Sequence, residues 1–212
     1  MKPENSLIAS IKGSKNSIDL IDKLGEAAID SLIDSGVLRD IPIIGTAISI
    51  YKAGNEISAH IFAKKIACFL SEVEKTSTQE RLDFFASLPE AEGEDSVGET
   101  LILILEKLDS YTLAKMLGKA FRLLAEGKLS KQTYEIYVHA IKQLNPYLIS
   151  QIKQLYAHES ISAIDSLAAV ALSNSGIVKI AILSTIDKNT QEIITSPQKT
   201  AFGRSFYENI VQ

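Results

Sequence analysis

The chain has 212 residues, of which 46% are hydrophobic and 23% are charged, and its formal net charge is −4. This composition is that of a globular protein and excludes a disordered or fibrous chain. The single cysteine, Cys68, excludes an internal disulfide and favours a reducing compartment. The N-terminus lacks a signal-peptide pattern, and the strongly apolar segments fall short of the roughly 20 residues that a membrane-spanning helix needs. We therefore expect a cytoplasmic protein, with a peripheral position at the inner membrane as the alternative.

Charge is unevenly distributed along the chain. Residues 76–110 carry two basic and nine acidic groups, whereas residues 111–212 carry eleven basic and seven acidic groups. We interpret this asymmetry as acidic and basic segments that balance each other's charge within the protein. The alternative is that the uneven charge steers an oppositely charged partner.

The first third of the chain predicts three amphipathic helices. Apolar residues recur at helical spacing over 17–38, and this helix should stop near Gly36. Pro42 suits the first turn of the next helix, which we expect over 43–54. The apolar periodicity resumes over 57–73 as a third helix or as a continuation of the second.

The most apolar segment runs from Ile41 to Tyr51, and small residues separate its isoleucines. Together with the apolar positions up to Leu70 it predicts a helical hairpin over 41–70. We favour a buried hairpin inside a helical core. The alternative is a hairpin that leaves the core and inserts into a membrane. The residues that would then form a membrane or partner surface are Ile43, Ile44, Ile48 and Tyr51.

The middle of the chain predicts further helices and one acidic loop. A helix over 78–88 should end at Pro89. Residues 90–96 are acidic but lack the ligand spacing of a calcium loop, so we interpret them as a solvated linker. The block 100–105 is apolar all round and predicts a buried helix at the centre of the fold.

The next helix should cover 110–126 and end at Gly127, and Ser130 should cap its successor. Two more helices are expected over 146–157 and 160–174. All of these segments have the periodicity of helices that bury one face.

The pattern changes after Gly176. Residues 177–183 and 191–195 predict a β-hairpin, and Ser196 and Pro197 predict the start of a final helix. We therefore expect a mainly α fold: a multi-helix bundle with a small C-terminal β-hairpin plus helix, in winged-helix-like order. The expected domains are a helical bundle over 1–160, which contains the apolar hairpin 41–70, and a small α+β subdomain over 161–212.

Motifs of catalysis or cofactor binding are lacking in the sequence. The histidines His60, His139 and His158 fall in separate helices without metal-ligand spacing, so we expect no metal site. Cys68 lies on an apolar helix face, where its thiolate is disfavoured. No nucleophile elbow, dinucleotide fingerprint or phosphate-binding loop is present, so we expect neither an enzyme nor a cofactor.

One set of cations has the spacing of a binding face. Three of its members share a helix face and two lie in the turn that follows: Lys115, Lys119, Arg122, Lys128 and Lys131. They could contact anionic groups of a lipid or a nucleic acid. We favour the interpretation as the solvated side of an amphipathic helix, because the chain as a whole is acidic.

The chain resembles the Abi-alpha (abortive infection) family of bacterial proteins. The motifs that carry the resemblance are Ile41-Pro-Ile-Ile-Gly, Lys64-Lys65-Ile66 and Phe69-Leu70, followed by Thr195, Phe202-Gly203 and Phe206-Tyr207. The resemblance covers most of the chain. The resemblance implies a role in bacterial defence against phage, and it implies no catalytic residue.

These observations predict a non-enzymatic, helical protein that binds another macromolecule within a bacterial defence or toxin-regulating system. Another protein or a second copy of the chain is the expected partner. One alternative is a membrane-active effector that inserts the 41–70 hairpin. The other is a winged-helix-like binder of nucleic acid, which the acidic composition does not favour; its contacts would be Lys179, Lys188, Lys199 and Arg204.

Overall fold

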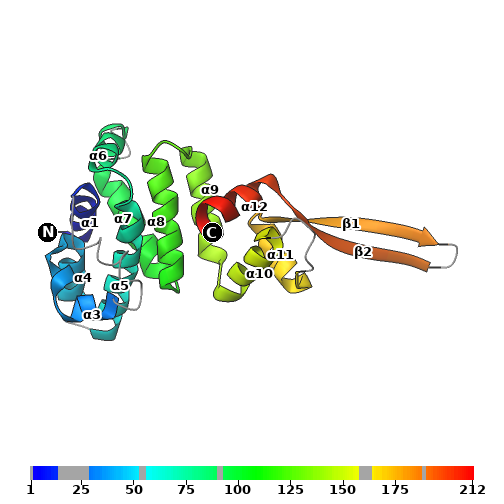
Figure 1. The fold of residues 1–212 in the computed structure, drawn as a ribbon, viewed down its shortest axis with the longest axis horizontal. Helices are drawn as coiled ribbons and strands as arrows, with labels where there is room; N and C mark the ends of the chain where they lie inside the picture. The colour runs from blue at the N-terminus through cyan, green and yellow to red at the C-terminus, as the bar shows by residue number, and fades with distance from the viewer. Residues whose placement is uncertain (1, 14–28, 53–55, 90–92, 158–163, 188–189) are drawn as a thin grey trace. The chain divides into compact units, whose positions relative to one another are not determined.

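The computed structural model describes residues 2–13, 29–52, 56–89, 93–157, 164–187 and 190–212. The chain divides into two units, residues 1–134 and 135–212. The described residues confirm a mainly helical fold with one two-stranded antiparallel hairpin near the C-terminus (Figure 1). We expected the division at 160/161. It falls earlier because helix α10 packs against α11 and the C-terminal turn η4, which places α10 in the second unit.

Unit 1 contains eight described helical elements, which we name by their bounds. They are α1 (Pro3–Lys12), α3 (Ile29–Asp34), η2 (Val37–Asp40), α4 (Pro42–Lys52), α5 (Glu56–Val73), α6 (Thr78–Ala86), α7 (Glu94–Lys107) and α8 (Tyr111–Ala125). The expected stop near Gly36 is present, because this glycine has a left-handed φ of 82° between α3 and η2. Residues 17–28 of the first predicted helix lie outside the described part of the chain.

The core of unit 1 is built on α5, which packs against both α4 and α8. Phe69 of α5 and Phe121 of α8 meet with their ring centroids 5.8 Å apart. Gly118 allows this close approach, because a Cβ atom there would clash with the backbone oxygen of Phe69. The two helices therefore pack nearly backbone to backbone, close to the end of α5.

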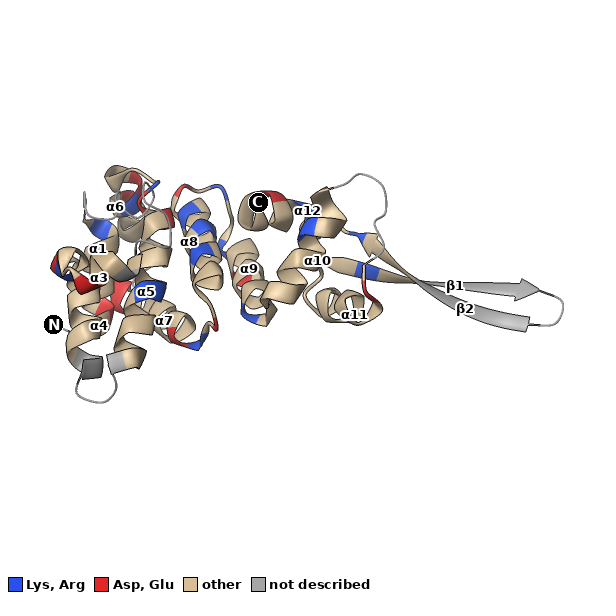
Figure 2. Ribbon diagram, turned by 60° about the horizontal axis from the view of Figure 1, so that its bottom comes forward, with Lys and Arg blue, Asp and Glu red and all other residues tan. Residues whose placement is uncertain are grey.

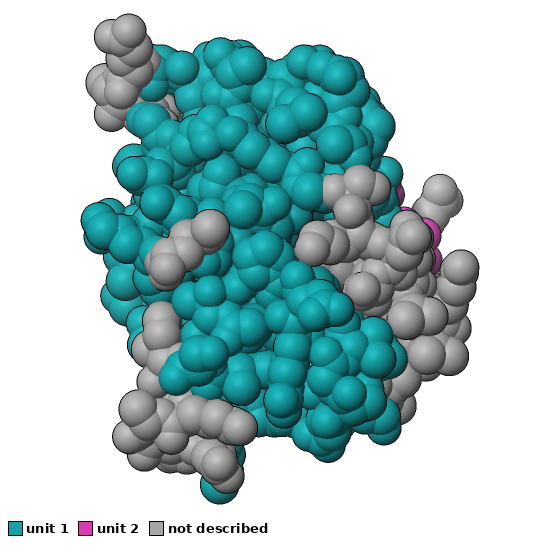
Figure 3. Space-filling model, turned by 90° about the vertical axis from the view of Figure 1, so that its left-hand side faces the viewer, with its two compact units in different colours: residues 1–134 teal, residues 135–212 magenta. Residues whose placement is uncertain are grey.

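The predicted apolar hairpin corresponds to α4 and α5. Ile43 and Ile44 are 0% exposed, Ile48 is half-buried, and the side chain of Tyr51 lies outside the described part of the structure. Figure 3 shows the surface of unit 1 on the side of α1 and α4, to which Ile43 and Ile44 contribute nothing. In this structure one face of the hairpin is core, whereas Ile57 and Ile61 of α5 are 71% and 41% exposed. Within the described residues no helix is both long and apolar enough to cross a membrane.

The expectation that 100–105 forms a helix buried on all sides is wrong. Leu101 and Leu105 of α7 are buried, but Leu103 is 48% exposed. Helix α7 packs against α1 and α5 with one face, so its other face remains at the surface.

Unit 2 begins within α9 (Lys131–Gln143) and continues with α10 (Pro146–Ala157) and α11 (Ser166–Asn174). The hairpin of β1 (Val178–Asp187) and β2 (Thr190–Lys199) follows, and then α12 (Ala201–Phe206) and η4 (Tyr207–Val211). Tyr137 of α9 packs edge-on against Phe206, with ring centroids 5.2 Å apart. The C-terminal elements are thus anchored on the helices of their own unit.

Ser196 and Pro197 do not open the final helix, as we had expected, because both belong to strand β2. The cap is Thr200, whose Oγ1 accepts a hydrogen bond from the Gly203 backbone N–H at 2.8 Å. The strand ladder continues to the pair Val178–Lys199, which leaves only Thr200 between strand and helix.

Candidate functional site

Helix α8 presents a cationic face made of Lys115, Lys119 and Arg122. Residues three or four positions apart lie on the same side of a helix. Ser110 is the N-cap of α8, and its Oγ accepts a hydrogen bond from the Leu113 N–H at 3.3 Å. Leu117 lies on the opposite, buried side. Figure 2 shows the basic residues as blue bands along α8.

These cations lie beside the carboxylate of Glu72, near the end of α5. The Glu72 side chain is 2% exposed, and its Oε1 is 3.1 Å from the Nζ of Lys75 and 4.0 Å from the Nζ of Lys115. Burial of a carboxylate is costly, and the C-terminal end of a helix disfavours negative charge further. The nearby cations offset part of this cost.

Lys119 is a half-buried cation whose surroundings alter its titration. Burial lowers its pKa below the usual 10.5, and the positive charges of Lys115, Lys75 and Arg122 lower it further, while Glu72 alone among these neighbours raises it. Burial is the largest of these effects on the Lys119 pKa, and Glu72 has the largest effect among the charged neighbours. An additional anion at this position would be attracted to the group as a whole.

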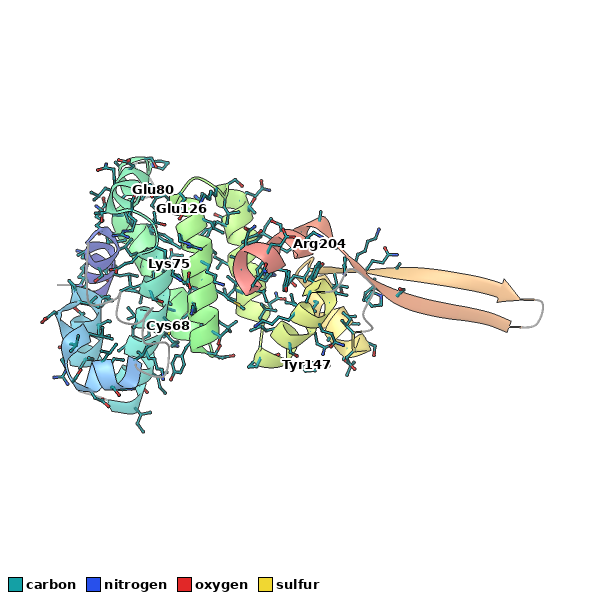
Figure 4. All side chains as sticks on the ribbon, viewed as in Figure 1. Cys68, Lys75, Glu80, Glu126, Tyr147 and Arg204 are labelled. Carbon is teal, nitrogen blue, oxygen red and sulfur yellow. The ribbon has the colours of Figure 1, made fainter. Side chains whose placement is uncertain are left out.

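We call Glu72, Lys75, Lys115, Lys119 and Arg122 the cationic cluster. Its members come from α5, from the turn after α5, and from α8, all within unit 1. Figure 4 shows Lys75 between these two helices. The Nε of Arg122 is buried and has no hydrogen-bond partner within the described structure, so one donor of the cluster is unsatisfied.

The structure brings together three of the five cations predicted from sequence. Lys128 instead pairs with Glu126, whose Oε2 lies 2.7 Å from its Nζ, and Lys131 is exposed at the first position of α9. Our sequence analysis missed Lys75 and Glu72. Their separation of three residues around the end of a predicted helix was the available signal.

The cations proposed for a winged-helix contact are dispersed within unit 2. Arg204 lies 3.8 Å from Glu208, and the Nζ of Lys199 lies over the ring of Tyr156, 5.9 Å from its centroid. Lys179 is exposed at the base of β1, and Lys188 lies outside the described residues. No common surface of these four cations can be described.

Other buried ionic groups of unit 1 have structural partners. Lys65 donates from Nζ to the backbone oxygens of Glu106 and Leu108, at 2.8 and 2.9 Å, and so caps the end of α7. Arg81 donates to the backbone oxygens of Thr76 and Gly13, at 2.6 and 3.0 Å, and so ties α6 to the end of α1. These two cations complete the fold and do not form a site.

The described residues include no group of three histidine, cysteine or acidic side chains placed to hold a metal ion. Cys68 is buried in α5, His60 lies on α5 and His139 lies on α9, while His158 falls outside the described part. The cationic cluster is therefore the candidate functional site.

Comparison with known proteins returned no matching family model, no matching curated protein and no matching solved structure. The resemblance to the Abi-alpha family thus rests on the short motifs in the sequence. The function is argued from the cluster itself.

Proposed function

We propose that this chain is a non-enzymatic protein that binds an acidic segment of another protein at the cationic cluster. One observation carries the proposal: Lys75, Lys115 and Lys119 lie near the buried carboxylate of Glu72, and Arg122 lies near Lys119, all within unit 1. Carboxylates of a bound segment would accept hydrogen bonds from these donors and reduce the repulsion among them.

The size and surroundings of the cluster favour a short acidic peptide over a nucleic acid. A nucleic-acid surface usually carries a broad basic patch in a basic domain, whereas this chain has a net charge of −4 and a pI of about 5.5. Membrane binding is less well supported because Ile43 and Ile44 are part of the core.

The resemblance to the Abi-alpha family suggests the setting of this interaction. We propose that the partner belongs to a bacterial phage-defence or toxin-regulating system and that both proteins are cytoplasmic. In that setting the chain would act by holding its partner.

The experiment is a fluorescence-anisotropy titration of the whole chain with a labelled peptide rich in Glu and Asp. A peptide of equal length with Gln and Asn in their place measures binding without charge. The double variant Lys115→Gln, Lys119→Gln should weaken binding of the acidic peptide by about tenfold or more, since each lost charge pair contributes on the order of 1 kcal/mol.

The matched control is Lys142→Gln, Lys153→Gln, which removes the same charge from exposed positions in unit 2. It should leave the affinity within about twofold of the unsubstituted chain. An equal loss in both double variants would show that binding is nonspecific and would overturn the proposal. Tighter binding of duplex DNA or of anionic vesicles through the same lysines would also overturn it in favour of those partners.

A further inference from the structure

Among the residues that the structure describes, nothing pairs with either outer edge of the β-hairpin of unit 2. Its ladder runs through ten pairs, from Val178–Lys199 to Asp187–Thr190, and no third strand joins it within the described residues. Figure 1 shows the strands extending away from α10 and α11. A two-stranded hairpin is marginally stable in water, and the backbone N–H and C=O groups along each edge can pair with another strand.

The two edges differ in their protection. Strand β2 contains Pro197, which lacks a backbone donor, and the charged residue Glu192 in its interior. Strand β1 has no proline, and its residues 180–186 are all uncharged. Proline and charge are the common means of blocking edge pairing, so β1 is the open edge.

The charges that flank this uncharged run are self-complementary. If two β1 strands pair antiparallel about a two-fold axis at Leu183, Lys179 of one copy lies opposite Asp187 of the other. The symmetry repeats the pair, so the sheet gains two opposite-charge pairs and no like-charge pair. Ile180 and Ile186 are brought opposite each other between these ends.

Backbone geometry allows this register and forbids the equivalent one for β2. In a strand, every second residue directs its backbone N–H and C=O to the same edge. Two residues that face each other across a two-fold axis must direct these groups in the same way. Their sequence numbers therefore differ by an even number. Lys179 and Asp187 meet this condition. Glu192 and Lys199 of β2 do not, so no two-fold pairing of β2 can place them opposite each other.

We propose that two copies of this chain associate through their β1 edges to form a four-stranded antiparallel sheet in the order β2–β1–β1–β2. The paired strands have ten residues each, a length of about 34 Å, so the bases of the two hairpins lie at opposite ends of the sheet. The site does not involve the cationic cluster, and the proposal is independent of the function proposed above.

The test is sedimentation velocity of the whole chain over a range of concentrations, with charge reversal at the two flanking positions. The unsubstituted chain should change from the 23.1 kDa monomer to twice that mass as concentration rises. Lys179→Glu or Asp187→Lys alone places like charges opposite each other twice and should raise the dimer dissociation constant by about tenfold or more. The double variant with both changes should restore it.

Circular dichroism of each variant verifies that the fold is retained. Oxidation of Leu183→Cys should give a cross-linked dimer, since the residue lies opposite itself, whereas Thr185→Cys should not; Cys68 is buried and is common to both. A monomer at all concentrations would overturn the proposal. So would a dimer that the single reversals leave intact, or one that the double reversal fails to restore. Lys115→Gln, Lys119→Gln should leave dimerisation unchanged.

Discussion

The two units satisfy their buried polar groups by different chemistry. In unit 1 the buried residues include the charged side chains Lys65, Glu72 and Arg81. In the described part of unit 2 the buried polar groups are uncharged, and hydroxyls connect the elements. The Tyr156 hydroxyl donates to the Ile177 backbone oxygen at 2.5 Å and accepts from the Thr200 N–H at 3.1 Å.

This difference has a consequence for function. Buried charges attract further charges and respond to pH and salt, so unit 1 is the part of the chain suited to ionic recognition. Neutral hydroxyl contacts hold a shape over a wide range of pH. Unit 2 therefore provides a stable base for the hairpin, and the proposed ionic site and the proposed paired edge lie in different units.

The most severe test of the comparison is Arg81→Met. This change removes the donors to Thr76 and Gly13 and leaves buried backbone oxygens without partners. Since each backbone oxygen left without its donor costs about 1–3 kcal/mol, the free energy of unfolding of unit 1 should fall by about 2–5 kcal/mol, measured by urea unfolding followed with far-UV circular dichroism. Arg39→Met, at an exposed position in η2, is the control. A loss below about 1 kcal/mol would show that the buried charge contributes little.

The corresponding test in unit 2 is Tyr156→Phe. The ring and its packing remain, but the bonds to Ile177 and Thr200 are lost. We expect unit 2 to lose about 1–3 kcal/mol in the same unfolding measurement. Tyr147→Phe removes a hydroxyl from a residue that is 49% exposed and should change stability by less than about 0.5 kcal/mol. Equal effects of the two changes would show that the hydroxyl of Tyr156 does not hold the unit together.

A smaller effect is expected from Ser77→Ala in unit 1. Ser77 caps α6 with its side chain, and Glu80 accepts in return from the Ser77 backbone N–H at 3.0 Å. Loss of this capping box should cost about 1 kcal/mol in thermal or urea unfolding. Ser96→Ala, at an exposed position in the first turn of α7, should have almost no effect. An equal loss of stability in Ser77→Ala and Ser96→Ala would indicate an effect of helix propensity and not of the cap.

The smallest expected effect is a dependence on alkaline pH that distinguishes the units. Burial lowers the pKa of Lys65 and Lys119 in the folded chain below 10.5. Between the lowered pKa and 10.5 the unfolded chain binds more protons, so their contribution to stability rises with pH. In unit 2, burial and Asp165 raise the pKa of Tyr147 above 10.0, so its contribution falls once the pH exceeds that value.

The measurement is thermal unfolding from neutral pH to about pH 10 for the unsubstituted chain and for Lys119→Met. The stability of the unsubstituted chain relative to Lys119→Met should rise with pH, because only the unsubstituted chain carries the buried lysine. Lys142→Met, at an exposed lysine in unit 2, is the control. An identical pH dependence of both variants would contradict the assigned burial of Lys119.

Much of the secondary structure could be predicted because its determinants are local. Ser110 and Gly127 mark the two ends of α8, and the β-branched run after Gly176 predicts a strand. Where a tertiary contact competed with a local preference, the prediction failed. Ser196 and Pro197 suit a helix start, but pairing across the hairpin holds them in a strand and transfers the cap to Thr200.

The candidate site was predicted only in part. Helical spacing placed Lys115, Lys119 and Arg122 together, because periodicity determines which residues share a face of one helix. Periodicity gives no information about which helix faces that side. Glu72 and Lys75 were therefore missed, since they approach α8 only after Gly118 has allowed α5 to pack closely against it.

The sequence by itself determined most of the helices, the hairpin and the absence of recognisable catalytic motifs, since each depends on residues that are neighbours in the chain. Only the tertiary structure decided that Ile43 and Ile44 are core, that Arg81 is buried, and that cations from two elements surround Glu72. The physical reason is that burial and electrostatic pairing depend on distances between segments far apart in the sequence, and packing of the folded chain sets those distances.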